Sequence, residues 1–258
     1  MMEANALLIN DIRARLLNGL LEYLGLENTY AAIVTGSTSQ KTDSPKSDLD
    51  LRLIVRDFEK TCDSFKKFLT DKKLILFEDR NPFAEVKFFL ENVPFHVLFY
   101  SFSHVEKSLK NRNLGFISTI TKGQFVYKQE DVINPVIAEC TRIVDEIRNS
   151  NEYLVGAKSQ FVKAMSRYEQ KKYSEAMYCL RVSTTYLIKD YLIKNGFIDI
   201  KEQWVLRDIE KADTTAGRTY LQSFMKVHQL EDIQVEQLKK NIAIVSTLIN
   251  TSNNSTKN

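Results

Sequence analysis

The chain has 258 residues, of which 43% are hydrophobic and 27% charged, with only 8 glycines and 4 prolines. This composition is ordinary for a globular protein and excludes collagen-like, low-complexity and wholly disordered chains. Lys and Arg outnumber Asp and Glu by only 36 to 33, so the net charge of +3 does not by itself predict a polyanionic partner. The length suffices for one large domain or two modest ones.

The cysteines and the start of the chain indicate an ordinary intracellular protein. Cys62, Cys140 and Cys179 are far apart and form no CxxC pair, so neither a disulfide framework nor a zinc site is expected. Charged residues interrupt the apolar positions near the N-terminus, which argues against a signal peptide or a membrane span. We therefore expect a cytoplasmic protein that makes no membrane contact.

The first half of the chain is predicted to combine helices with a sheet. Apolar residues recur every four positions from Leu8 to Leu24 and stop at Gly25, which predicts an amphipathic helix that packs on a sheet. Residues 58–69 are predicted to be helical, and Glu91 and Asn92 to form a tight hairpin turn. The predicted strands are 30–34, 49–55, 73–78, 84–90, 93–100 and 124–127.

The second half is predicted to be a helical bundle. From Ile133 onward the apolar residues follow a helical period, and the predicted helices are 133–149, 152–170, 173–195, 214–229 and 232–250, with Trp204 in a shorter connection. The sequence therefore predicts an α+β protein. Its parts are a mixed sheet with flanking helices at 1–130, a helical bundle at 131–250 for acceptor binding or dimerisation, and a frayed polar tail at 251–258.

One stretch of the first half carries recognisable chemistry. An apolar strand ends at Gly36 and Ser37, and ten residues separate Ser37 from Asp48, which is followed by Leu49 and Asp50. Strand alternation places both carboxylates on one face, where Mg²⁺ would relieve their repulsion. A glycine turn lets backbone amides approach a phosphate, and Ser37 adds a hydroxyl. The pattern predicts a metal–triphosphate site, although two solvent-facing aspartates beside an ordinary turn would also explain it.

These residues resemble the signature of the DNA polymerase β-like nucleotidyltransferase superfamily, in which an apolar strand, a Gly-Ser turn and Asp-x-Asp follow one another. The signature covers only about residues 30–55. By order of elements and length, the whole chain is similar to the antibiotic nucleotidyltransferases that modify kanamycin or lincosamides. The resemblance implies a nucleotidyltransferase-type sheet and a Mg²⁺-dependent reaction. In it a nucleoside monophosphate, AMP from ATP by resemblance alone, moves onto a hydroxyl of a small aminoglycoside- or lincosamide-like acceptor and releases pyrophosphate.

The chain departs from the superfamily at the third carboxylate. By order, that acid would lie on the strand at 93–99, but the same-face residues there are Pro94 and His96. Glu85 on the preceding strand or Glu91 in the hairpin turn are candidates to replace it. His96 is a candidate general base, and a hydrogen-bonded histidine on a half-buried strand is an equally good interpretation.

Three further residues are weaker candidates. Arg52 shares the face of the two aspartates, so it is expected to neutralise them, to contact phosphate, or simply to form a surface ion pair. The resemblance implies a base and a phosphate-holding lysine early in the helical domain, where Glu152 and Lys158 stand. A solvated helix face explains both equally well.

Two other functions stay open. The absent acid suggests a catalytically impaired protein that keeps the fold as a nucleotide-sensing or protein-interaction module. Transfer onto RNA or protein gains little support, because the chain has no long basic run and Lys171 and Lys172 form only a pair. The apolar faces of the bundle are compatible with a homodimer.

Overall fold

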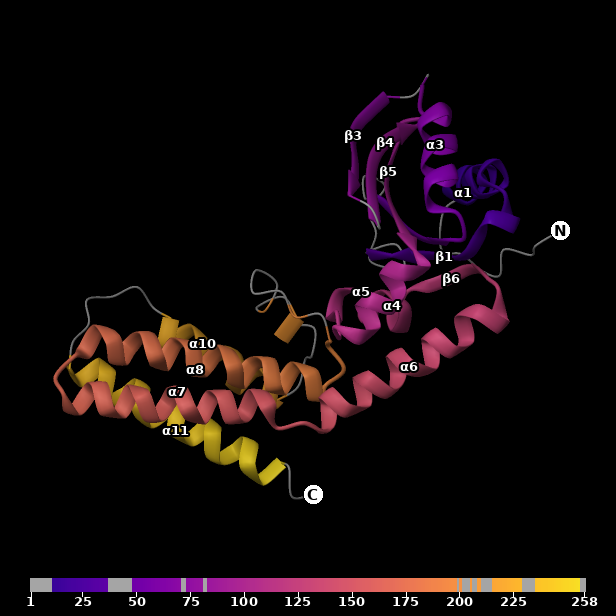
Figure 1. Ribbon diagram of the computed structural model, residues 1–258. Helices are drawn as coiled ribbons and strands as arrows, with labels where there is room; N and C mark the ends of the chain where they lie inside the picture. Colours follow the sequence, from indigo (N-terminus) through magenta and orange to yellow (C-terminus); the bar gives the residue numbers. More distant parts are fainter. Residues whose placement is uncertain are drawn as a thin grey trace. The chain divides into compact units, whose positions relative to one another are not determined.

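The computed structural model (Figure 1) describes residues 11–36, 48–70, 73–80, 83–198, 200, 205, 208–209, 215–228 and 235–255. The chain folds as two compact units, Met1–Ile143 and Val144–Asn258. The division falls inside helix α6 (Glu130–Asn149), later than the change of sequence period near residue 130. The α+β class is confirmed, because a mixed sheet with flanking helices precedes a helical region.

Six strands of the first unit form one sheet in the order β3-β4-β5-β2-β1-β6. β2 and β5 pair in parallel, and the other neighbouring pairs are antiparallel. Each predicted strand is found, with ends within two residues of the prediction. The strands are β1 (Thr29–Thr35), β2 (Leu49–Val55), β3 (Lys73–Arg80), β4 (Phe83–Leu90), β5 (Val93–Ser101) and β6 (Gln124–Lys128).

One face of this sheet carries the core of the unit. Helices α1 (Asp11–Leu24) and α3 (Phe58–Phe68) lie side by side on it (Figure 1). The face consists of alternate strand residues such as Leu51, Val86 and Val97, which are fully buried against leucines of α1 and phenylalanines of α3. Because strand side chains alternate, the residues between them point to the opposite face.

The predicted hairpin turn between β4 and β5 is confirmed. Leu90 pairs with Val93, and Glu91 and Asn92 have φ values of 47° and 65°. Positive φ at both central residues is the conformation of a type I′ turn, whose twist matches that of the strands it joins. The turn fixes the register of β4 against β5.

The opposite face is partly covered by two short helices that the periodicity did not predict. They are α4 (Phe102–Lys110) and α5 (Leu114–Lys122), and the short helix η1 (Leu26–Asn28) precedes β1. The side chains of Ser101 and Asn113 cap α4 and α5 by accepting hydrogen bonds from the backbone amides of His104 and Phe116. α4 contacts β2 and β5, and α5 contacts β1. Nine-residue helices show too few turns for a clear sequence period.

The second unit consists of helices packed around α8. Helices α7 (Glu152–Glu169), α10 (Thr215–His228) and α11 (Val235–Ser255) all contact α8 (Tyr173–Lys194). The face of α8 that packs in the core includes Leu180 and Leu187, which are fully buried. Trp204 lies outside the described residues. None of the helices in the described ranges has both the length and the hydropathy that a membrane crossing requires.

The end of α11 differs from the frayed tail expected from residue 251. The helix continues to Ser255, and the buried Ser252 hydroxyl lies 2.5 Å from the Tyr220 hydroxyl of α10. Polar composition indicated fraying, but this buried hydrogen bond anchors the last turns. Residues 256–258 of the expected tail lie outside the described residues.

Candidate functional site

A glycine corner lies where β1 and β2 meet. Thr35 pairs with Asp50 across the antiparallel strands, and Gly36 follows with a φ of 72°. A Cβ atom at Gly36 would clash with the Asp50 carboxylate oxygen Oδ2. The position therefore favours glycine both for its backbone conformation and for the close approach of the carboxylate. Ser37, the predicted neighbour in this turn, lies outside the described residues.

The two aspartates flank a buried leucine. Leu49 is fully buried in the core, Asp48 is exposed just before β2, and the Asp50 side chain is 24% exposed. Alternation places Asp50 on the face that lies opposite α1 and α3, because its neighbours Leu49 and Leu51 belong to the core. The Asp48 and Asp50 side chains are both at least partly accessible to solvent.

Basic and acidic side chains alternate along a line that crosses three strands on this face. The His96 Nδ1 atom of β5 lies 2.9 Å from Asp50 Oδ1 of β2, and its Nε2 atom lies 2.8 Å from Glu85 Oε1 of β4. At the two ends, Arg52 lies 3.4 Å from Asp50 Oδ1 and Lys87 Nζ lies 3.2 Å from Glu85 Oε1. We call this set of five residues the charge line.

Strand register produces the charge line. His96 is the direct partner of Asp50 in the parallel β2–β5 pair, and of Lys87 in the antiparallel β4–β5 pair. Side chains at paired positions share a face, and diagonal neighbours are within reach of long side chains. Glu85, two residues before Lys87, therefore reaches the far nitrogen of the imidazole.

The contacts of His96 restrict its chemistry. An ionised carboxylate can only accept a hydrogen bond, so both contacts are satisfied when both ring nitrogens carry protons and the ring is an imidazolium. Burial tends to raise the pKa of Glu85, but hydrogen bonds from Lys87 and His96 outweigh burial and lower that pKa. With both nitrogens engaged, His96 is placed to orient Asp50 rather than to stand free as a base.

Mg²⁺ fits the carboxylate pair by the nature of its donors. Mg²⁺ is commonly held by one or two carboxylates together with waters and substrate phosphates, and Asp48 and Asp50 are two partly accessible carboxylates next to a glycine corner. In the part of the chain that is described, no group of three or more His, Cys, Asp or Glu is arranged to hold a metal. The His96 ring stands between Asp50 and Glu85 and pairs with both, so these acids do not converge on one ion.

The remaining predicted residues lie elsewhere. Glu91 pairs with Arg15 of α1, on the core side of the sheet, and so points away from the charge line. Glu85 is the candidate that reaches His96, and Lys87 is the member that sequence reasoning missed. Glu152 is exposed at the start of α7 and Lys158 is half-buried on the same helix. Both belong to the second unit.

Comparison with known proteins assigns no family. No protein-family model matches the chain, and no curated protein matches it. Among solved structures, a nucleotidyltransferase-like protein from Exiguobacterium sibiricum is similar, with 10% sequence identity and a TM-score of 0.49. The similarity covers 93% of this chain and 75% of that chain. A likeness this distant is not evidence for function or for family membership.

Proposed function

We propose that the first unit binds a nucleoside triphosphate and transfers its nucleoside monophosphate to a hydroxyl of a small acceptor. The observation that carries the proposal is the glycine corner, where Gly36 abuts the Asp50 carboxylate and the exposed Asp48 stands two residues before Asp50. An exposed backbone turn beside paired carboxylates is suited to a triphosphate and its counterion. ATP is the nucleotide we expect, on resemblance alone.

Each residue of the site would have a defined task. The backbone at Gly36 would approach the phosphates closely, Ser37 would donate a hydroxyl hydrogen bond, and Asp48 and Asp50 would hold Mg²⁺. The bound Mg²⁺ would neutralise phosphate charge. Arg52 and His96 already contact Asp50 Oδ1, which fixes the direction of its second oxygen.

The reaction would be an in-line displacement at the α-phosphorus. The acceptor hydroxyl oxygen forms a bond to this phosphorus, the bond to the bridging oxygen breaks, pyrophosphate leaves, and the hydroxyl proton passes to a base. Placing two reactants in line supplies much of the rate in such reactions. Glu152 and Lys158 stay candidates for the base and for a phosphate contact on resemblance alone.

The test is pyrophosphate release in the presence of Mg²⁺, ATP and a panel of aminoglycosides and lincosamides. Asp48→Asn and Asp50→Asn are each expected to lower the rate at least a hundredfold, because the neutral amide binds a hard cation poorly. Asp63→Asn is the matched control, since Asp63 is an exposed aspartate on α3. Full activity in Asp48→Asn or Asp50→Asn would refute the proposal.

A second function is favoured by one specific observation. His96 lies on the strand that, by order of elements, would carry the third acid of the resembling enzymes, and it already pairs with two carboxylates. A protein that binds nucleotide without turnover, and that acts as a nucleotide-sensing or protein-interaction module, would have no need of that acid. ATP binding by calorimetry, with no transfer to any acceptor of the panel, would favour this module over the enzyme.

A further inference from the structure

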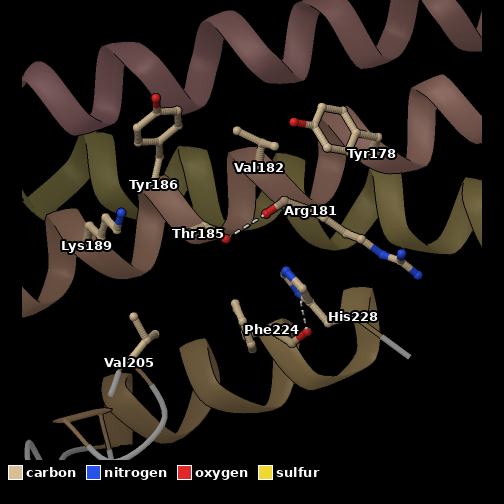
Figure 2. Close-up of a pocket in the computed structure, with 9 residues that line it drawn as sticks. All are labelled: Tyr178, Arg181, Val182, Thr185, Tyr186, Lys189, Val205, Phe224 and His228. Atoms are coloured by element: carbon tan, nitrogen blue, oxygen red, sulfur yellow. Dashed lines mark hydrogen bonds between the residues drawn. The ribbon is translucent and has the colours of Figure 1, made fainter. Parts of the chain in front are cut away.

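A pocket of about 460 Å³ lies in the second unit, between α8 and α10 (Figure 2). Its volume falls in the range of pockets that enclose small organic molecules. One side is a stripe of α8 residues spaced three or four apart, which runs from Tyr178 to Lys189. The core residues Leu180 and Leu187 lie on another face of the same helix. The pocket belongs to one unit, and Val205, Tyr186 and Phe224 of its lining also contact the core of that unit.

The pocket is rich in cationic groups. Arg181 and Lys189 line it and stand eight residues apart on α8, a separation of about 12 Å along a helix. The Arg181 Nε atom donates a hydrogen bond to the Val227 carbonyl oxygen at 3.3 Å, which holds the guanidinium beside the end of α10. No acidic side chain is found among the described residues that line the pocket. This lining favours an anionic ligand.

The α10 side of the pocket carries two stacked aromatic rings. The rings of Phe224 and His228 stack with centroids 3.7 Å apart and planes 20° apart (Figure 2). The His228 Nδ1 atom donates to the Phe224 carbonyl oxygen at 3.0 Å. Burial, with a contribution from the charge of Arg181, lowers the pKa of His228. At neutral pH its Nε2 atom is then a hydrogen-bond acceptor.

The opposite side adds two more rings. Tyr178 and Tyr186 line the pocket from α8, and the Tyr186 ring lies against Gly156 of α7, where a Cβ atom would be in van der Waals contact with it. A gap left by imperfect helix packing would be lined by apolar side chains, because they fill a bundle interior. Flat rings together with cationic groups are the lining that a planar anionic molecule needs.

We propose that this pocket binds a small molecule with a planar ring and an anionic group, the chemistry that nucleotides and aromatic carboxylates share. The ring stacks on the Phe224–His228 pair, and Arg181 and Lys189, at opposite ends of the pocket, supply the positive potential that attracts the anionic group. This site is separate from the glycine corner and does not depend on the function proposed for it.

Calorimetric titration of the full-length protein in EDTA tests the proposal with three probes. Adenosine 5′-monophosphate and benzoate represent the two ligand sources, and adenosine carries a ring without an anionic group. Saturable binding of the monophosphate identifies a nucleotide site, and binding of benzoate alone identifies an aromatic carboxylate site. Failure of both anions to bind, or equal binding of adenosine and its monophosphate, would overturn the proposal.

Substitutions in the pocket test whether the binding measured by these titrations occurs there. Val182→Trp fills the pocket from α8, and Lys189→Gln replaces a cation with a neutral polar side chain. Each is expected to weaken binding about tenfold or more. Lys240→Gln, at an exposed lysine of α11, is the matched control and should bind as the parent chain does. If Val182→Trp does not fold, Lys189→Gln decides, and unchanged affinity in Lys189→Gln would reject the pocket.

Discussion

His96 changes the electrostatics of the carboxylate face from repulsion to neutralisation. Three acids at this place would repel one another unless a cation were bound, whereas the His96 ring lies between Asp50 and Glu85 and offers a nitrogen to each of them. The cations of Arg52 and Lys87 complete the balance at the ends of the charge line. The sheet therefore does not need a metal to tolerate these carboxylates.

A single substitution at His96 tests this interpretation. His96→Asp would join three acids, and we expect it to destabilise the protein in EDTA by about 1–3 kcal/mol, since it also leaves polar groups unpaired. Added Mg²⁺ should raise the melting temperature more in His96→Asp than in the parent chain, because an ion bound only by the folded state stabilises it.

His96→Asn is the control for that experiment. It removes the imidazole without adding charge, so it should lose stability and gain no response to Mg²⁺. Equal Mg²⁺-induced shifts in the parent chain and His96→Asp, measured by differential scanning fluorimetry, would contradict the proposed role of His96.

The Glu85 carboxylate predicts a pH dependence of stability. Its pKa is lower in the folded chain than its ordinary value of 4.5, so the unfolded state binds this proton more tightly. The stability that Glu85 contributes is then present above pH 4.5 and lost as the pH falls through the folded pKa.

Urea unfolding of the parent chain and Glu85→Gln measures that contribution. We expect Glu85→Gln to be less stable at pH 7 by up to about 1 kcal/mol, the range of partly exposed ion pairs. The difference should shrink as the pH is lowered below 4.5. A difference that stays constant over this range would show that the Glu85 charge is not responsible.

At the scale of elements, the end of β1 depends on the glycine at position 36. Gly36→Ala would place a Cβ atom against Asp50 in a left-handed conformation, and we expect a loss of about 1–3 kcal/mol. Gly19→Ala is a matched control inside α1, where no atom lies within 4 Å of an added Cβ. It should stabilise the helix by roughly 0.5–1 kcal/mol. Chemical denaturation of both variants tests whether the free energy of unfolding falls in Gly36→Ala and rises in Gly19→Ala.

The last turns of α11 are predicted to support the second unit. Ser252→Ala would leave the buried Tyr220 hydroxyl without the partner seen at 2.5 Å, at a cost of about 1–3 kcal/mol. Thr247→Ala, at an exposed position of the same helix, should change stability by less than about 0.5 kcal/mol. Thermal unfolding followed by circular dichroism compares them, and equal melting temperatures would argue against an anchored end.

The sequence predicted elements whose period extends over several turns or alternations. Long helices such as α8 and strands such as β2 carry enough repeats, and the hairpin at Glu91 and Asn92 carries a residue-specific signal. Helices α4 and α5 were missed because each is only nine residues long. The sequence did not predict that α11 continues to Ser255, because the hydrogen bond between Ser252 and Tyr220 joins distant helices and is not visible in local composition.

The site was predictable only where its residues are close in sequence. Gly36, Asp48 and Asp50 stand out as a local pattern. Glu85 and Lys87 were not identified as partners of His96, because their meeting depends on the register of two strand pairs. A single sequence does not fix that register.

At the scale of the whole molecule, the two units carry different chemistry. The glycine corner and the charge line belong to the first unit, and the cationic aromatic pocket belongs to the second. Each unit has its own hydrophobic cluster. The two proposed binding functions can therefore be altered by substitutions in one unit at a time.

The parallel pairing of β2 with β5 has a consequence for biosynthesis. Asp50 and His96 are separated by 46 residues, and β3, β4 and α3 must all be translated before they can meet. Until the ribosome has released β5, Asp50 of the nascent chain lacks its imidazole partner, and the line of side chains that orients this carboxylate cannot form.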